Sequence, residues 1–172
     1  MVTDSSVDNN EDTLSYIISV QQKQKLQNIQ KSSSSLRICC YGSSSSRTQE
    51  RYKTDAYMLG QILSRRGHTC VNGAGAFGCM GALNKGVEEA KGPGGVFGVM
   101  HEMFINKHDG NRKKSWLEGC APVFSNCDNA EIFVAGGNDL QQRKKKLVEN
   151  ADALIVMPGG PGTFDEVRTK ER

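Results

Sequence analysis

From Leu36 onward, short apolar runs alternate with helical spacings of apolar residues, and this alternation constrains the fold more than any other feature. The apolar runs predict strands at residues 36–41, 68–72, 95–100, 131–135 and 153–157. Helices are predicted at 48–66, 79–90 and 140–150, and a last helix follows residues 158–162. Four of the five strands have no polar face, which is typical of a parallel sheet that is buried on both sides. The sequence therefore predicts the α/β class, as a Rossmann-like parallel sheet with helices on both faces.

This predicted domain occupies residues 36–172, and the residues before it differ in composition. Residues 1–12 are acidic and polar, residues 13–31 favour a helix rich in Gln and Lys, and residues 32–35 are serines. We expect residues 1–35 to form a polar, flexible N-terminal extension. The polar stretch 101–129 interrupts the alternation and predicts an inserted loop. Because the chain stops at Arg172, just inside a helix, we expect the domain to be incomplete at its C-terminus.

Composition argues against several classes of protein. A formal net charge of +3, from 22 basic and 19 acidic residues, is too small to predict binding to nucleic acid or to an anionic membrane. No run of about 20 apolar residues is present, so we expect no membrane-spanning helix. The first twelve residues hold four acids and no cation, which argues against a signal peptide. Six cysteines without metal-binding spacing predict buried free thiols, a reducing cytoplasmic location and no metal site.

Two glycine loops follow predicted strands. Residues 73–78 match GxGxxG, and residues 158–163 read Pro-Gly-Gly-Pro-Gly-Thr. Such loops present backbone N–H groups to an anion, so the pair predicts one crevice that grips a nucleotide from two sides. We expect these loops and the turn at residues 42–44 to converge at one edge of the sheet. The alternative for the first loop is that its glycines only allow a tight turn and close helix packing.

Several polar residues have simpler interpretations. Thr163 and Glu166 have the spacing of a capping box, and spacing alone favours that role for Glu166. The four cations at residues 143–146 are typical of a solvated helix face, but Arg143 is adjacent to the apolar stripe of Leu140 and Leu147 and is not clearly on the far side of the helix. His101 and His108 are predicted to lie on the surface, and Trp116 is predicted to anchor local packing rather than to stack on a base.

The order of these motifs resembles the LOG (Lonely Guy) family of cytokinin riboside 5′-monophosphate phosphoribohydrolases. The family signature PGGxGTxxE is met in full by residues 158–166, with Arg143-Lys144 upstream. Residues 40–44, 73–75 and 78–81 are similar to the family's first strand and loop, its GGG and its GLMG, although Ala74 replaces a glycine. The likeness runs from about residue 36 to residue 166.

The resemblance implies a Rossmann-like nucleotide-binding catalytic domain that splits the N-glycosidic bond of a nucleoside 5′-monophosphate. Glu166 is then the carboxylate that stabilises the transition state and activates water, and Arg143 holds the substrate. The implied partners are the nucleotide substrate and a second copy in a homodimer, with no organic cofactor and no metal. The implied substrate-binding residues are Lys144, Gly159, Gly160, Pro161, Gly162, Thr163, Asp165, Ser43, Ser44 and Gly75.

Two rival functions remain open from sequence. Related folds bind a nucleotide or the molybdenum cofactor without cutting it, as carrier proteins, and such a carrier does not need the pair Arg143 and Glu166. A nicotinamide-binding module would use the first glycine loop together with Glu102 as the ribose-binding acid.

Overall fold

The computed structural model describes residues 34–104, 123–149 and 151–168 of the chain. The chain divides into two units, residues 1–34 and 35–172, and the description below concerns the second unit. The extension proposed for residues 1–35 lies almost wholly outside the described residues, as do His108, Trp116 and Cys120. These assignments therefore stay predictions.

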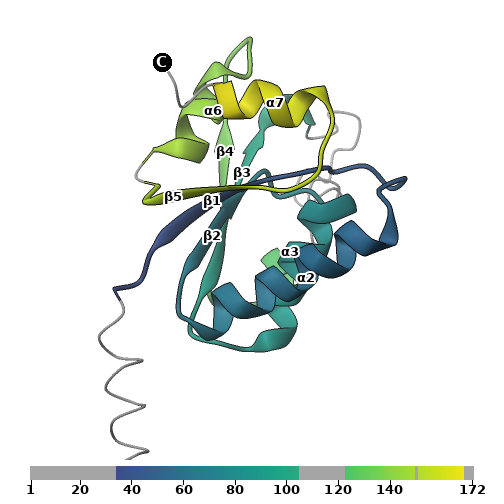
Figure 1. Ribbon diagram of the computed structural model, residues 1–172. Helices are drawn as coiled ribbons and strands as arrows, with labels where there is room; N and C mark the ends of the chain where they lie inside the picture. Colours follow the sequence, from purple (N-terminus) through teal and green to yellow (C-terminus); the bar gives the residue numbers. More distant parts are fainter. Residues whose placement is uncertain (1–33, 105–122, 150, 169–172) are drawn as a thin grey trace, which may run out of the picture. The chain divides into compact units, whose positions relative to one another are not determined.

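Five parallel strands form one sheet in the order β4-β3-β2-β1-β5 (Figure 1). The strands are β1 (Arg37–Tyr41), β2 (Thr69–Asn72), β3 (Gly95–His101), β4 (Ala130–Ala135) and β5 (Ala153–Val156). The chain adds β2, β3 and β4 on one side of β1 and then places β5 on the other side. The direction of winding thus reverses between β1 and β5, which is where open α/β sheets form a ligand crevice.

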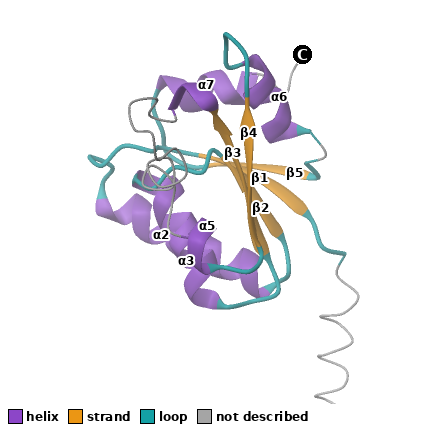
Figure 2. Cartoon of the chain, turned by 180° about the vertical axis from the view of Figure 1, so that it is seen from behind, coloured by secondary structure: helices purple, strands orange, loops and turns teal. Residues whose placement is uncertain are grey.

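Helices cover both faces of this sheet, as predicted (Figures 1 and 2). The helices are α2 (Glu50–Arg65), α3 (Gly78–Ala90), α5 (Val123–Asn126), α6 (Gln141–Val148) and α7 (Pro161–Val167), with a 3-10 turn η1 at Glu102–Phe104. The predicted bounds are met to within two residues. The loop predicted over residues 101–129 is too wide, because β3 continues to His101 and α5 packs near α3 and β4. Val123 of α5 is fully buried, and this burial explains why that segment is ordered as a helix.

Alternate residues of the central strands build a core on each face. Ile38 and Cys40 of β1 join the core beneath α2 and α3, whereas Cys39 and Tyr41 join Leu147 of α6 on the opposite face. This alternation is the period of two that a β-strand imposes on its side chains. Cys39, Cys40, Cys70 and Cys79 are buried and in no disulfide, as predicted for the cysteines, whereas Cys127 is only half-buried.

Helices α2 and α3 approach each other closely, as Figure 2 shows, because each has a glycine at the crossing. A Cβ at Gly60 would overlap the carbonyl oxygen of Leu83, and a Cβ at Gly86 would overlap that of Tyr57. Gly67 follows the C-terminus of α2 with a φ of 77°, a left-handed conformation that glycine adopts without strain where a helix ends.

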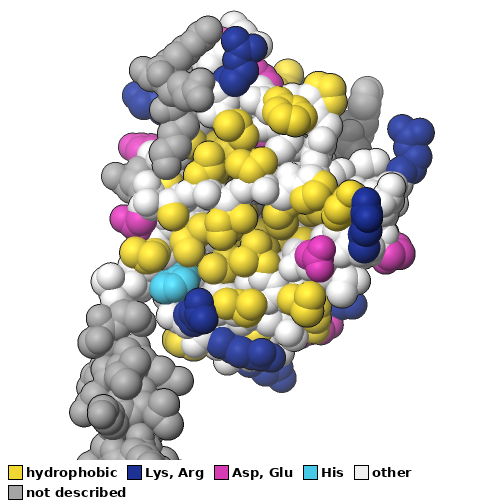
Figure 3. Space-filling view, in the orientation of Figure 1, with side chains coloured by type: hydrophobic (Ala, Val, Ile, Leu, Met, Phe, Trp, Pro, Cys, Tyr) yellow, Lys and Arg dark blue, Asp and Glu magenta, His cyan; other side chains and the backbone are white. Residues whose placement is uncertain are grey.

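The edge strand β5 is less covered than the central strands. Its Val156 side chain is 49% exposed, while the β2 residues Cys70 and Val71 are fully buried. Figure 3, which has the orientation of Figure 1, shows hydrophobic side chains gathered across the face of the molecule that is turned toward the viewer. Within the described residues, no helix has the length and apolar character that a membrane span requires.

Candidate functional site

A cavity of about 500 Å³ lies at the carboxyl ends of the strands. Its walls come from the loops after β1, β2 and β5, from the end of β3 and from α6 and α7. The predicted convergence of the three loops at one edge of the sheet is therefore confirmed. The predicted site residues that line the cavity are Ser43, Ser44, Gly75, Arg143, Gly160, Gly162, Thr163 and Glu166. Lys144, Gly159, Pro161 and Asp165 do not line it, although each lies next in sequence to a residue that does.

Arg143 and Glu166 meet at the wall of this cavity. The Arg143 Nη1 donates to Glu166 Oε1 at 2.9 Å, and its Nε donates to the Val99 carbonyl of β3 at 3.0 Å. The two side chains are only 10% and 13% exposed, so the pair is largely shielded from bulk solvent. Nη2 points at Gly73, where a Cβ would overlap it, and donates to no described residue. One donor of the guanidinium thus stays available to a ligand.

The burial of Arg143 overturns the solvated-face interpretation of residues 143–146. Arg143 and Lys144 are 8% and 9% exposed, whereas Lys145 of the same run is exposed. The Lys144 ammonium pairs with the Asp165 carboxylate of α7. The two neighbouring cations of α6 therefore each reach an acid on α7, which ties the two helices together on this face.

The capping box predicted from Thr163 and Glu166 is wrong. Helix α7 begins at Pro161 with Gly160 as its N-cap, and no side chain bonds to the cap. Thr163 therefore lies inside the first turn, and the Glu166 carboxylate turns toward Arg143 instead of the helix start. Pro161 fits the first helical position because that position needs no backbone N–H donor.

The loop after β5 is tied to the loop after β1 and leaves its central glycines open. Ser43 N–H donates to the Pro158 carbonyl at 3.0 Å, and Met157 N–H donates to that of Tyr41 at 2.8 Å. A Cβ at Gly160 or at Gly162 would meet nothing within 4 Å. The N–H groups of these two glycines make no hydrogen bond within the described part of the chain. They can therefore receive a ligand oxygen.

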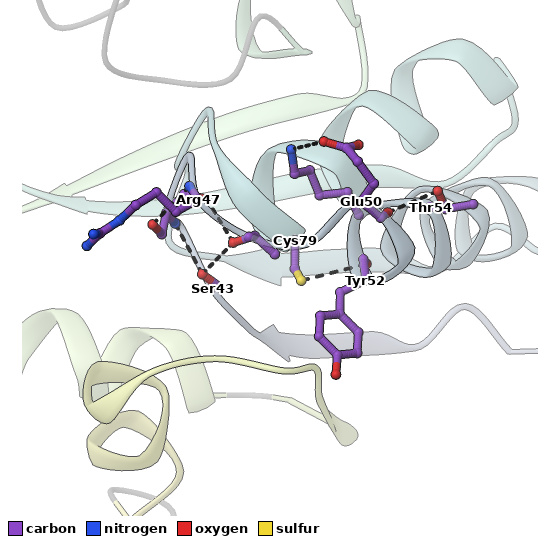
Figure 4. A network of polar contacts seen from close by, with 9 residues as sticks. Ser43, Arg47, Glu50, Tyr52, Thr54 and Cys79 are labelled. Carbon is purple, nitrogen blue, oxygen red and sulfur yellow. Dashed lines mark hydrogen bonds and ion pairs between the residues drawn. The ribbon is translucent and has the colours of Figure 1, made fainter.

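The loop after β1 is held by its own hydrogen bonds (Figure 4). Thr48 Oγ1 donates to Ser43 Oγ at 2.8 Å, and Ser45 N–H donates to the same oxygen at 3.2 Å. The Cys79 thiol of α3 donates to the Tyr52 carbonyl of α2 at 3.7 Å, and burial raises the pKa of this thiol. The hydroxyl of Ser43 thus serves the loop itself, and Ser44 and Ser45 are left as the other serines that line the cavity.

The loop after β2 is organised by two buried asparagines that the sequence did not single out. Asn72 Nδ2 donates to Asn84 Oδ1 at 2.7 Å, and Asn72 Oδ1 accepts the N–H of Ala74 at 2.8 Å. Ala74 adopts a φ of 63°, the left-handed region, at the position where the family has a glycine. Gly75 N–H donates to the sulfur of Met80 at 3.0 Å. This loop therefore bonds mainly to its own surroundings.

The end of β3 supplies an apolar part of the cavity wall. Met100 and Phe104 line the cavity there, together with Met80 of α3. His101 is fully buried, so its predicted surface position is wrong; its Nδ1 accepts the Met103 N–H at 3.0 Å. Glu102 is exposed and does not line the cavity, so it is not placed as a ribose-binding acid would be. The described residues contain no cluster of three His, Cys, Asp or Glu side chains suited to a metal ion.

Known proteins share both the sequence and the fold of this domain. The chain is 30% identical over 131 residues to cytokinin riboside 5′-monophosphate phosphoribohydrolase LOG5 of Arabidopsis thaliana, covering 76% of this chain and 49% of the relative. It is likewise 30% identical to the probable enzyme LOGL5 of Oryza sativa subsp. japonica, covering 76% of this chain and 46% of the relative. The chain thus spans about half the length of these curated relatives.

Solved structures with this fold include a molybdenum cofactor binding protein from Rippkaea orientalis, with a TM-score of 0.56 and 21% identity. That match covers 80% of this chain and 71% of the other. The Moco carrier protein of Chlamydomonas reinhardtii matches with a TM-score of 0.55 and 20% identity, over 80% of this chain and 73% of the other. At such identities the likeness shows the fold alone. The family described as "Possible lysine decarboxylase" matches residues 80–169, just over half of the sequence, and the chain therefore belongs to this family, which is the LOG family.

Proposed function

We propose that this protein is a hydrolase that cleaves the N-glycosidic bond of a nucleoside 5′-monophosphate and releases the free base and ribose 5-phosphate. The observation that carries the proposal is the 2.9 Å contact between Arg143 and Glu166 at the cavity wall. The names of the relatives, which are cytokinin riboside 5′-monophosphate phosphoribohydrolases, support it. A cytokinin base and a homodimer, which the resemblance implies, and a cytoplasmic location, which the cysteines predict, belong to the same proposal.

The loop after β5, with the first turn of α7, is the proposed binding site of the 5′-phosphate. Gly160 and Gly162 have open space where side chains would stand, so a phosphate can approach their unbonded N–H groups. The side chain of Thr163 adds a hydroxyl at the same wall of the cavity. Backbone N–H groups and a hydroxyl are donors, as an anionic phosphate requires. The phosphate then lies at the junction of β1 and β5.

In the proposed reaction, the substrate and a water molecule bind beside Glu166. The bond between ribose C1′ and the base nitrogen breaks, its electron pair leaves with the base, and the water oxygen joins C1′. Glu166 accepts one proton from this water, the departing base takes up a proton from solvent at its nitrogen, and Glu166 then returns its proton to solvent, so the reaction consumes one water molecule overall. The carboxylate also stabilises the positive charge that develops on the ribose ring. The free Nη2 donor of Arg143 holds the substrate while Nη1 keeps Glu166 oriented.

The test is release of base from adenosine monophosphate and from its prenylated form, measured by chromatography. Glu166→Gln keeps the size of the side chain and a hydrogen bond to Arg143, but it cannot act as a base. We expect turnover to fall at least about a hundredfold, the usual scale for a general base. Glu149→Gln is the matched control, because Glu149 is exposed and lies outside the cavity.

The same assay separates the hydrolase from the carrier function. A carrier binds its nucleotide without releasing base, so wild-type protein that binds but never cleaves would contradict the proposal. Turnover of Glu166→Gln at the wild-type rate would remove Glu166 from the mechanism. Arg143→Ala should also lose activity, and because it removes the buried partner of Glu166 and the donor to the Val99 carbonyl, its thermal melting should fall as well.

A further inference from the structure

The proposed chemistry leaves one part of the cavity without a role. Met80, Met100 and Phe104 line it, and their side chains contain no nitrogen or oxygen. The Met80 sulfur already accepts the Gly75 N–H. The part of a ligand that rests here is therefore recognised by apolar contact and shape rather than by side-chain hydrogen bonds.

The strand order places this apolar wall far from the proposed phosphate loop. Met100 is in β3 and Phe104 follows it, while Gly160 and Gly162 follow β5. Two strands, β2 and β1, lie between β3 and β5 in the sheet. At about 4.8 Å per strand, the two ends of the crevice are about 14 Å apart. A nucleotide whose phosphate lies at β5 thus directs its other end, the base, toward β3.

Phe104 is held in place although its ring is 57% exposed. It ends the turn η1, and the Met103 N–H of this turn donates to the buried ring of His101. The same His101 ring packs edge-to-face against Phe104, with ring centroids 6.4 Å apart and planes at 79°. An exposed aromatic ring on a fixed support loses little freedom when a flat ligand stacks on it.

We propose that Phe104 is the stacking platform for the nucleobase, and that Met100 completes an apolar base subsite at the β3 end of the cavity, with Met80 next to it beside the loop after β2. The identity of the ligand as a nucleoside monophosphate rests on the proposed function, whereas the direction of binding rests on the positions of these residues. Because stacking on an aromatic ring is stronger for a base of larger area, we expect the subsite to favour purines over pyrimidines. Its lack of polar side chains allows apolar substituents on the base.

The test compares binding of adenosine monophosphate with binding of ribose 5-phosphate, which lacks the base, by calorimetry on the 172-residue chain carrying Glu166→Gln, so that the nucleotide is not cleaved during the titration; in this test, wild type means that background. Phe104→Leu removes the ring, and Phe104→Trp enlarges it. Met103→Leu is the matched control, because Met103 lies in the same turn, is 53% exposed and does not line the cavity.

We expect Phe104→Leu to raise the Kd for adenosine monophosphate about tenfold and to leave that for ribose 5-phosphate unchanged. Phe104→Trp should bind adenosine monophosphate at least as tightly as the wild type, and the advantage over cytidine monophosphate should shrink in Phe104→Leu. The base subsite would be overturned if Phe104→Leu lost affinity equally for both ligands or lost none. It would also be overturned if the wild type failed to bind adenosine monophosphate. If binding depends on Phe104 but no base is ever released, the hydrolase proposal fails and the base subsite stands.

Discussion

The two glycine loops of this domain are similar in sequence and differ in how they use their backbone. After β2, the N–H groups of Ala74 and Gly75 donate to the side chains of Asn72 and Met80, so these two donors are already bonded within the protein. After β5, the N–H groups of Gly160 and of Gly162, in the first turn of α7, have no bonding partner among the described residues, and the space where their side chains would stand is open. A glycine-rich stretch after a strand is therefore not sufficient evidence of an anion site.

The loop after β2 still contributes to the cavity, because the absence of a side chain at Gly73 leaves space for the Arg143 guanidinium. Gly73 is the position where a methyl group would collide with the Arg143 guanidinium. The glycine thus allows a cation from α6 to cross the end of β2 and reach Glu166. One loop provides donors and the other provides space, and substitutions in the two loops should separate these roles.

Among substitutions that compare the two loops, the largest effect is expected from Gly73→Ala. The added methyl group displaces Arg143 from Glu166, so release of base from adenosine monophosphate should fall at least about tenfold. Adding Arg143→Ala to this variant should cost little more, because both changes remove the same contact. A double variant that loses activity as the product of the two single losses would contradict this coupling.

A matched pair of glycine substitutions should separate the loops by stability. In Gly81→Ala the new methyl group overlaps the Ala76 backbone of the first loop, which should lower the free energy of unfolding by about 2 kcal/mol. In Gly162→Ala the methyl group meets open space at the start of α7, so stability should be retained or rise by up to about 1 kcal/mol. Urea unfolding measures both. Equal destabilisation of the two variants would show that the loops do not differ in packing.

Asn84 tests whether the first loop is a scaffold. Asn84→Ala removes the partner of the fully buried Asn72 amide, and the orphaned donor should cost on the order of 1–2 kcal/mol of stability. Asn138→Ala serves as control because Asn138 is exposed. If thermal melts of Asn84→Ala match those of the control, the asparagine pair does not support the loop.

The smallest effect is expected at Tyr41, whose carbonyl anchors the second loop through Met157. Its buried hydroxyl has no hydrogen-bond partner among the described residues, so Tyr41→Phe should change stability near pH 7 by less than about 1 kcal/mol. A larger loss would show that the hydroxyl has a structural role.

The same residue predicts a pH dependence. Burial first, and then the neighbouring Cys39 and Glu166, raise the pKa of Tyr41 above its usual value of 10.0. The folded protein therefore keeps this proton to higher pH than the unfolded chain, and stability decreases as pH rises past about 10. Urea unfolding at pH 7 and pH 10.5 should show a smaller alkaline loss in Tyr41→Phe than in the wild type.

Much of the site could be predicted because parallel strands bring their carboxyl ends to one edge. Once the strands were placed, the turns after β1, β2 and β5 had to converge, and the cavity confirms that they do. Arg143 and Glu166 were named from the family signature, and they do meet. Local spacing was less reliable: it left the face of Arg143 undecided and wrongly made Glu166 part of a capping box.

What the sequence by itself determined is the order of the elements, because apolar periodicity and glycine positions are local properties of the chain. The tertiary structure decided which polar groups are hydrogen-bonded within the protein and which can bind a ligand. Asn72 and Asn84 lie twelve residues apart and pair only after β2 and α3 pack, and Phe104 gains its support only from the buried His101 ring. A hydrogen bond or a ring contact between distant residues depends on packing in three dimensions, and no local pattern encodes it.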